Sequence, residues 1–260
     1  MQIEDIISVI EKTAPLSGQA DWDKSGVQVT REGNAVTAIA VFLDPLPSVI
    51  EVASRKAEFL LSHHPLTLEP SLPKLHDNWY YSLRHLFNTN ALLYAAHTSL
   101  DVNLAGPAGW LGRMLGLENT RPLEPDRKNP ATGFGGIGEL PVPRDFEDVI
   151  QEVLTLAKCG EATLCGKEPG RKITRIAWCG GSGSSLIPLA KAAGADLFIT
   201  GDVKHHSAVD ALLPVLDVGH HSLEEEMMRR FANLLREQIP SMTIDFIPTK
   251  PPFKRIRQGV

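Results

Sequence analysis

Two adjacent histidines, His63 and His64, have the residue type and the setting for metal chemistry. They directly follow the apolar run 58–62 and precede Pro65. Because neighbouring residues of an extended chain point to opposite sides, two such imidazoles are poorly placed to bind one ion and well placed to bind two. An isolated pair would more simply be two ordinary loop histidines, so the interpretation depends on what accompanies them.

Two later segments share a pattern of histidine, serine, leucine and acid. Residues 97–101 read HTSLD, residues 220–224 read HHSLE, and each segment follows a short apolar run. The histidine and the acid are four residues apart, a spacing that brings both onto one face of a helix. The residues concerned are His97, Asp101, His220 and Glu224.

Together the three clusters offer imidazole nitrogens and carboxylate oxygens, a mixture that suits Zn, Mn, Fe or Ni. A carboxylate shared by two cations would create a two-metal site of the kind used in hydrolysis. We therefore predict two divalent metal ions per chain. For Glu224 an alternative is open, because it is the first of three consecutive acids that a helix N-terminus would favour in solvent. Ser222 and Glu225 have the spacing of a capping box, which would begin that helix just after His220.

Two other polar segments are candidates for the same cleft. The segment TGDVKHH, residues 200–206, contains Asp202, His205 and His206, which could contact a substrate or support the ligands. The segment CGGSGSS, residues 179–185, follows a predicted strand. It could hold a phosphate through its backbone N–H groups, or it could be an ordinary tight turn.

The elements that must position these residues follow a repeated order. Short apolar strands alternate with helices in both halves of the chain, which favours an α/β fold with mainly parallel sheets flanked by helices. In such sheets ligands gather at the carboxyl ends of the strands, where the candidate residues lie. The predicted strands are 37–44, 58–62, 90–101, 174–181, 196–206 and 213–226, and the predicted helices between them include 45–57 and 184–195.

The repetition predicts two similar α/β lobes with a metal cleft between them. The boundary falls in the Pro- and charge-rich stretch 120–133, which gives a first lobe of residues 1–125 and a second of residues 126–260. On this division the first lobe carries the two adjacent histidines and HTSLD. The GHHSLE segment of the second lobe completes the site.

Composition places the chain among globular proteins. Of its 260 residues 43% are hydrophobic and 22% charged, and the formal net charge is −5 with a pI of about 6.0. No long basic stripe is present, so nucleic acid is not an expected partner. The first 18 residues read as an amphipathic helix and not as a signal peptide, and no segment has the length of a membrane span. The three cysteines lack zinc or redox spacing, which predicts a cytoplasmic location.

Five motifs in the order SHHPL, HTSLD, CGGSGSSLI, TGDVKHH and GHHSLEEE resemble those of the NGG-interacting-factor-three-like family. Members of that family are also named GTP cyclohydrolase 1 type 2 homologues. The resemblance implies two α/β lobes, a dinuclear metal centre in a cleft, a small-molecule substrate and a homohexameric ring. By motif it places His97 beside a set of metal ligands. Those implied ligands are His63, His64, Asp101, His220 and Glu224.

The sequence departs from the family pattern at several positions. The segment WDKSGVQVT replaces the usual WDNxGLQVG, so that Lys24 and Thr30 are atypical. Thr67 stands where an aromatic residue usually follows the histidine pair, His221 where a tyrosine is common, and Ser99 where an asparagine is common. None of these changes removes a ligand that the resemblance implies.

The leading functional hypothesis is a metal-dependent hydrolase of a small molecule. Two cations would activate water, and His97 or His206 would move the proton, since an imidazole titrates near neutral pH. The family name implies a purine nucleotide as substrate, which no residue of the sequence identifies by itself. The alternative is a regulatory, scaffold or metal-handling protein without turnover. An open coordination position favours the enzyme, and a saturated ligand set favours the alternative.

Overall fold

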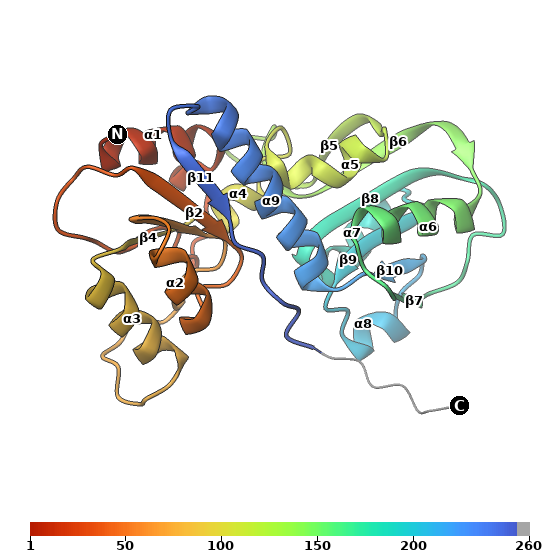
Figure 1. The fold of residues 1–260 in the computed structure, drawn as a ribbon. Coiled ribbons are helices and arrows are strands. Elements are labelled where there is room, and N and C mark those ends of the chain that lie inside the picture. The colour runs from red at the N-terminus through yellow and green to blue at the C-terminus, as the bar shows by residue number, and fades with distance from the viewer. Residues whose placement is uncertain (254–260) are drawn as a thin grey trace.

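The structure is a computed structural model that describes residues 1–253. Two sheets flanked by helices form its two lobes, as Figure 1 shows. This arrangement confirms the predicted α/β class. Within the described residues no helix is long and apolar enough to cross a lipid bilayer.

The first sheet consists of β1 (Gly26–Val29), β2 (Ala38–Phe42), β3 (Phe59–Ser62), β4 (Leu92–Ala95) and β11 (Thr243–Phe246). The strands lie in the order β1, β4, β3, β2, β11. The pairings among β4, β3, β2 and β11 are parallel, and only β1 is antiparallel to its neighbour. Every residue of β2, β3 and β4 is buried, which explains why these strands read as uninterrupted apolar runs.

The second sheet consists of β5 (Glu118–Pro125), β6 (Gly133–Arg144), β7 (Thr163–Cys165), β8 (Ile173–Ser182), β9 (Leu197–Gly201) and β10 (Val215–Asp217). Its order is β5, β6, β8, β9, β10, β7. The central strands β8, β9 and β10 are parallel. The outer pairings β5–β6, β6–β8 and β10–β7 are antiparallel.

The helices lie on and between these sheets. The predicted N-terminal helix is confirmed as α1, with acidic residues in its first turn and Lys12 in its last, as the helix dipole favours. The described helices are α1 (Ile3–Thr13), α2 (Pro47–Ser54), α3 (Asn78–Thr89), α4 (Thr98–Asp101), α5 (Trp110–Met114), α6 (Phe146–Leu156), α7 (Ile187–Ala192), α8 (His205–Val209) and α9 (His220–Gln238). Short 3-10 turns occupy Leu16–Gly18, Pro107–Gly109 and Ser184–Leu186.

The repeated order is visible in the units β2–α2–β3 and β8–α7–β9, each a parallel strand pair joined by a helix. The sheets nevertheless exchange strands across residue 125. Strand β5, which precedes this boundary, pairs with β6 in the second sheet. Strand β11, near the other end of the chain, pairs with β2 in the first sheet. Helix α9 therefore leaves one sheet and leads into the other.

Three predicted boundaries are wrong in a way that matters for the candidate residues. The strand expected to reach residue 206 ends with β9, and α8 carries His205 and His206. The strand expected to reach Asp101 ends with β4, and the short helix α4 carries that residue. The strand expected to reach residue 226 ends with β10, and α9 begins at His220 itself. Ser222 therefore lies inside the helix, and the residue that precedes the helix is Gly219, with a φ of 85° and no side-chain cap. The predicted capping box is absent.

Helix α9 joins the lobes through a continuous apolar face. Leu223, Met227, Met228, Phe231 and Leu235 recur at helical spacing and are all buried. They belong to one hydrophobic cluster that also contains side chains of β2, β3, β8 and β9. The core thus runs through both sheets and holds α9 between them.

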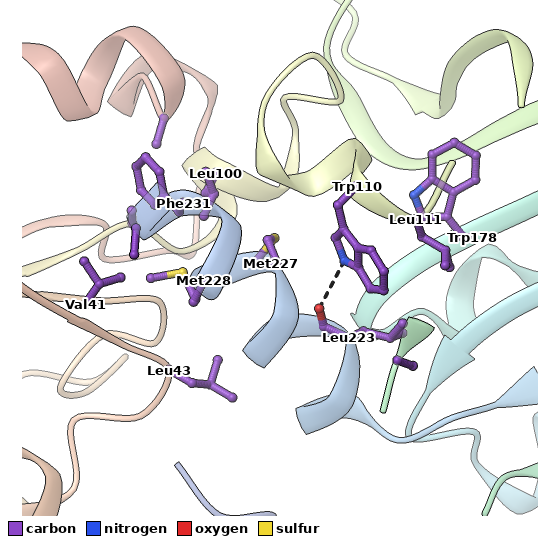
Figure 2. Packing of buried hydrophobic residues seen from close by; sticks show 14 of the residues in the cluster. Val41, Leu43, Leu100, Trp110, Leu111, Trp178, Leu223, Met227, Met228 and Phe231 are labelled. Carbon is purple, nitrogen blue, oxygen red and sulfur yellow. Dashed lines mark hydrogen bonds between the residues drawn. The ribbon is translucent and has the colours of Figure 1, made fainter. Parts of the chain in front are cut away.

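Figure 2 shows how the two ends of this face meet the two lobes. Met228 lies near Val41 of the first sheet, whereas Leu223 lies near Trp110. The indole N–H of Trp110 donates a hydrogen bond of 3.2 Å to the backbone carbonyl oxygen of Leu223. This bond fixes the first turns of α9 relative to α5.

We expect Phe231→Ala to lower the free energy of unfolding by about 3–5 kcal/mol, because it leaves a cavity in the core that both sheets share. The exposed Glu237→Ala on the same helix is the control and should change stability by less than about 0.5 kcal/mol. Urea unfolding followed by circular dichroism measures both values. Equal effects of the two substitutions would contradict the placement of Phe231 in a shared core.

Candidate metal centre

The candidate ligands come from distant parts of the chain and meet at the carboxyl ends of β3, β4 and β10. The adjacent histidines directly follow β3, HTSLD follows β4 and forms α4, and HHSLE follows β10 and opens α9. All five residues implied as ligands lie together, with the sixth candidate, His97, beside them. The group comprises His63, His64, His97, Asp101, His220 and Glu224.

Glu224 lies at the centre of this group and is only 4% exposed. Its Oε1 is 3.5 Å from Nε2 of His63, and Asp101 Oδ1 is 3.6 Å from the same nitrogen. Its Oε2 is 3.1 Å from Nε2 of His64 and 2.7 Å from Nε2 of His220. The two carboxylate oxygens therefore face two different sets of donors, as a bridging ligand requires.

The two adjacent histidines are oriented by hydrogen bonds from the far side of each ring. Nδ1–H of the fully buried His63 donates to the backbone carbonyl oxygen of Ala96 over 2.8 Å. Nδ1–H of His64 donates to Oδ1 of Asp44 over 2.7 Å. Because Nδ1 carries the proton in each ring, the Nε2 lone pair of each is directed at Glu224.

The same arrangement recurs at the other two histidines. Nδ1–H of His220 donates to Oδ2 of Asp202 over 2.8 Å, and Nδ1–H of His97 donates to Oδ1 of Asp23 over 2.7 Å. Asp23 is itself held by Thr98, whose hydroxyl donates to Oδ2 over 2.6 Å. Histidines that bind metals are typically fixed in this way through their second ring nitrogen.

When no cation is present, the lone pairs of these nitrogen and oxygen atoms point toward one another. Nε2 of His63 is buried and has no hydrogen-bond partner among the described residues. Two donors bound about 2.1 Å from one tetrahedral ion lie about 3.4 Å apart. The separations of 3.5 and 3.6 Å around His63 and of 3.4 Å between Nε2 of His64 and His220 match that spacing. The donor set therefore fits divalent cations.

In the metal-free protein, protons can bind to these nitrogens in place of metal ions. Burial alone would lower the pKa of His64, but hydrogen bonds to Asp44 and Glu224 outweigh it and raise the pKa to about 10. The pKa of His220 rises to about 9 because Glu224 and Asp202 likewise outweigh burial. These protons stabilise the metal-free fold fully below pH 6.5, and their contribution is lost as the pH rises through about 9–10. Metal binding at neutral pH must displace them.

The pKa values of the two carboxylates of the centre shift in opposite directions, although burial acts on both in the same way. Burial raises the pKa of Asp101, and the charge of Glu224 adds to that effect against the opposing charge of His63. Burial would also raise the pKa of Glu224, but the positive charge of His63 and a hydrogen bond from His220 hold it well below its usual value. Glu224 is thus the permanent anion of the site, and it requires positive charge around it.

Part of the glycine-rich segment 179–185 passes directly over this carboxylate. Gly181 has a φ of 59°, and a Cβ added there would lie 2.3 Å from Oε1 of Glu224. At the preceding Gly180 an added Cβ would meet Glu224 only at 3.9 Å. Position 181 therefore favours glycine for two reasons, its positive φ and the close approach of the backbone to the carboxylate of Glu224.

The structure also shows the positions of residues whose supporting roles the sequence left open or did not reveal. Asp202 supports His220, as expected of the TGDVKHH segment. His206 lies exposed on α8 with its ring against His205, and its role in proton transfer stays a prediction. Asp23 and Asp44 were not identified as supports. Each lies close in sequence to a recognised feature, Asp23 within WDKSG and Asp44 just after β2, but neither has a spacing that indicates its partner.

A cavity of about 390 Å³ adjoins the centre. Asp101, His220 and Glu224 line it, as does His97. Its other walls include the backbone of the glycine-rich turn and four aromatic side chains, Trp22, Trp110, Phe134 and Trp178. A small molecule in this cavity would therefore contact the candidate metal ligands.

Comparison with known families agrees with this geometry. The sequence model of Duf34/NIF3 (NGG1p interacting factor 3) matches residues 1–252. The chain belongs to the DUF34/NIF3 family. The family predicted from the five motifs is thereby confirmed.

Relatives and solved structures of this family extend over the whole chain. A Clostridium perfringens protein named GTP cyclohydrolase 1 type 2 homolog is 30% identical over 96% of this chain and 97% of its own length. NIF3-like protein 1 of Drosophila melanogaster is 26% identical over 93% of this chain and 84% of its own. The structure of a Staphylococcus aureus hypothetical protein matches with a TM-score of 0.89 and 25% identity, covering 98% of this chain and 99% of that one.

We expect Gly181→Ala to reduce the bound metal strongly, because the new methyl group would displace the carboxylate of Glu224. Gly180→Ala is the matched control, since its added Cβ makes only ordinary contacts and its φ is not positive. Metal content per chain, measured by plasma emission spectroscopy on purified folded protein, compares the two. A full metal complement in Gly181→Ala would contradict the position assigned to Glu224.

Proposed function

We propose that this DUF34/NIF3 protein is a dinuclear divalent-metal-dependent hydrolase of a small molecule of purine or phosphorylated type. The observation that carries the proposal is that the donor cluster is also a wall of a cavity. Asp101, His220 and Glu224 offer atoms to a cation and at the same time line a space of about 390 Å³. A purely structural metal site is typically closed by its ligands, whereas a catalytic one remains accessible.

Five ligands support two cations only if further positions are filled by water or substrate. When bound, the cations would supply Lewis acidity and activate water for attack. Asp101 and Glu224 would set the charge of the centre. Three histidines, fixed through Nδ1, would present Nε2 in a constant direction, so that the donor geometry exists before a substrate arrives.

His97 is the side chain best placed to carry a proton. Its Nδ1–H is engaged by Asp23, so its Nε2 is free to accept a proton. It lines the cavity, and one of its ring nitrogens lies within 4.8 Å of a ring nitrogen of His63 and of His64, close enough for the three to share a cation. Hydrolysis requires one proton to leave the attacking water and one to reach the departing nitrogen or oxygen. A single imidazole with a carboxylate behind it can perform both transfers in turn.

The name of the Clostridium perfringens relative suggests the substrate class. That protein, 30% identical to this chain, is named a homolog of GTP cyclohydrolase 1 type 2. Opening of a purine-type ring adds water across a C–N bond, which is hydrolytic chemistry that a dinuclear centre supports. The cavity's four aromatic side chains are compatible with a planar ring. Assembly into a homohexamer stays a prediction of the family resemblance.

We expect His97→Ala to lower turnover by about 10²–10⁴-fold while metal content stays near that of the wild type, because a proton carrier acts on the chemical step. Turnover of a panel of nucleosides, nucleotides and cyclic amides is measured beside metal content on the same preparations. Parallel loss of metal and turnover would make His97 a ligand or ligand support. If the metal-loaded wild type hydrolyses nothing in the panel, the non-catalytic metal-binding role replaces the hydrolase.

A further inference from the structure

The β5–β6 hairpin contributes a carboxylate and an aromatic ring to the same cavity wall. Glu124 and Phe134 are direct partners in the antiparallel register, so their side chains leave the hairpin on one face. Both line the cavity that also holds Asp101 and Glu224. Neither residue belongs to the donor cluster or to the motifs that identify the family.

The carboxylate of Glu124 is available for a ligand. It is exposed on β5, and none of the ion pairs found among residues 1–253 involves it. Its charge nevertheless acts within the cavity, because burial first and then Asp101, Glu224 and Glu124 raise the pKa of the Cys179 thiol. Glu124 is therefore an acceptor without a cationic partner, beside an aromatic surface.

The lining as a whole has an unusual balance of charge for a nucleotide site. It contains three carboxylates, those of Asp101, Glu124 and Glu224, and within the described part of the chain no Lys or Arg. Asp101 and Glu224 would be bound to the cations of the centre, whereas Glu124 lies outside the donor cluster and would keep its oxygens for a ligand. A polyphosphate is normally held by Lys, Arg or helix N-termini. The wall has no Lys or Arg, and the N-terminal parts of α4 and α9, which line it, already carry the carboxylates of Asp101 and Glu224. A ring placed against the centre would find no Lys or Arg side chain in this wall for phosphates attached to it.

We propose that Glu124 and Phe134 select a planar nitrogen heterocycle that carries no phosphate, with the Glu124 carboxylate accepting hydrogen bonds from an N–H edge of the ring. The inference rests on the proposed hydrolase function and specifies its substrate class. Phe134 offers a face for stacking, and the two oxygens of Glu124 match two adjacent N–H donors, as in a 2-aminopyrimidinone ring. The opposite edge of the ring is then free to meet the donor cluster.

Two nucleosides and one nucleotide, tested with the metal-loaded protein, distinguish the role of the N–H edge from the effect of a phosphate. Guanosine has two adjacent N–H donors, inosine lacks the exocyclic amine, and guanosine 5′-monophosphate adds one phosphate without the strong chelation of a triphosphate. By isothermal titration calorimetry we expect guanosine to bind about 10-fold more tightly than inosine and at least about 10-fold more tightly than the monophosphate.

Substitutions in the β5–β6 hairpin test whether Glu124 causes the preference for guanosine. Glu124→Gln should weaken guanosine binding by about 10- to 100-fold and remove the preference over inosine, because an amide offers a single acceptor oxygen. Glu118→Gln, the same change at another exposed glutamate of β5 that does not line the cavity, is the control and should bind like the wild type. Metal content is measured in both variants, and it should be unchanged.

Several results would overturn the inference. These are equal or tighter binding of the monophosphate, equal binding of guanosine and inosine by the wild type, and unchanged guanosine binding in a metal-replete Glu124→Gln. Failure of all three probes to bind would also reject the ring class. If none of the probes binds but another substrate is hydrolysed, the hydrolase proposal stands and only the ring class is rejected. If guanosine binds but no substrate is turned over, the hydrolase proposal is rejected and the recognition site is kept.

Discussion

Glu224 is an acidic side chain enclosed in the interface between two lobes, with imidazole nitrogens on both of its oxygens. An ionised carboxylate in such a place costs several kcal/mol unless positive charge compensates it. The nitrogens around it are turned toward it with their lone pairs, since the opposite nitrogen of each ring donates to a fixed oxygen. This combination of negative oxygens and bare nitrogens is stable only with cations among them, whether protons or metal ions.

The rest of the fold serves to hold that arrangement. Helix α9 begins after β10 of the second sheet and leads into β11 of the first, so it is anchored in both sheets. Its apolar face packs into a core that both sheets share, and the Trp110 indole holds the backbone at Leu223, next to Glu224. The glycine at 181 lets the end of β8 approach the carboxylate. Any shift of one lobe against the other would change the distance from Glu224 to His63, which belongs to the first.

The sequence allowed much of this to be predicted, for identifiable reasons. The fully buried parallel strands produce unbroken apolar runs, so the fold class could be recognised. The histidines and acids follow those runs directly, so it could also be predicted that they lie together. The start of α9 could not be predicted correctly, because Ser222 and Glu225 have the spacing of a capping box that the chain does not form. The pairing of β11 with β2 joins segments about two hundred residues apart, and no local pattern records it.

The supporting carboxylates were harder to predict than the donors. Asp23 reaches His97 across 74 positions of sequence and Asp44 reaches His64 across 20, so each partnership exists only in the folded chain. Glu124 is equally inconspicuous, since a single acid in a charged stretch before a turn is usually solvated. Its significance comes from the cross-strand partner Phe134 and from the cavity that both residues line.

The central claim is that the two oxygens of Glu224 face two separate cations. Anomalous diffraction from crystals of the metal-loaded protein, recorded above and below the absorption edge of the metal, tests this most directly. The account predicts two anomalous peaks per chain, one beside His63 and Asp101 and one beside His64 and His220, each within bonding distance of a different oxygen of Glu224. A single peak, or peaks that leave Glu224 uncoordinated, would contradict it.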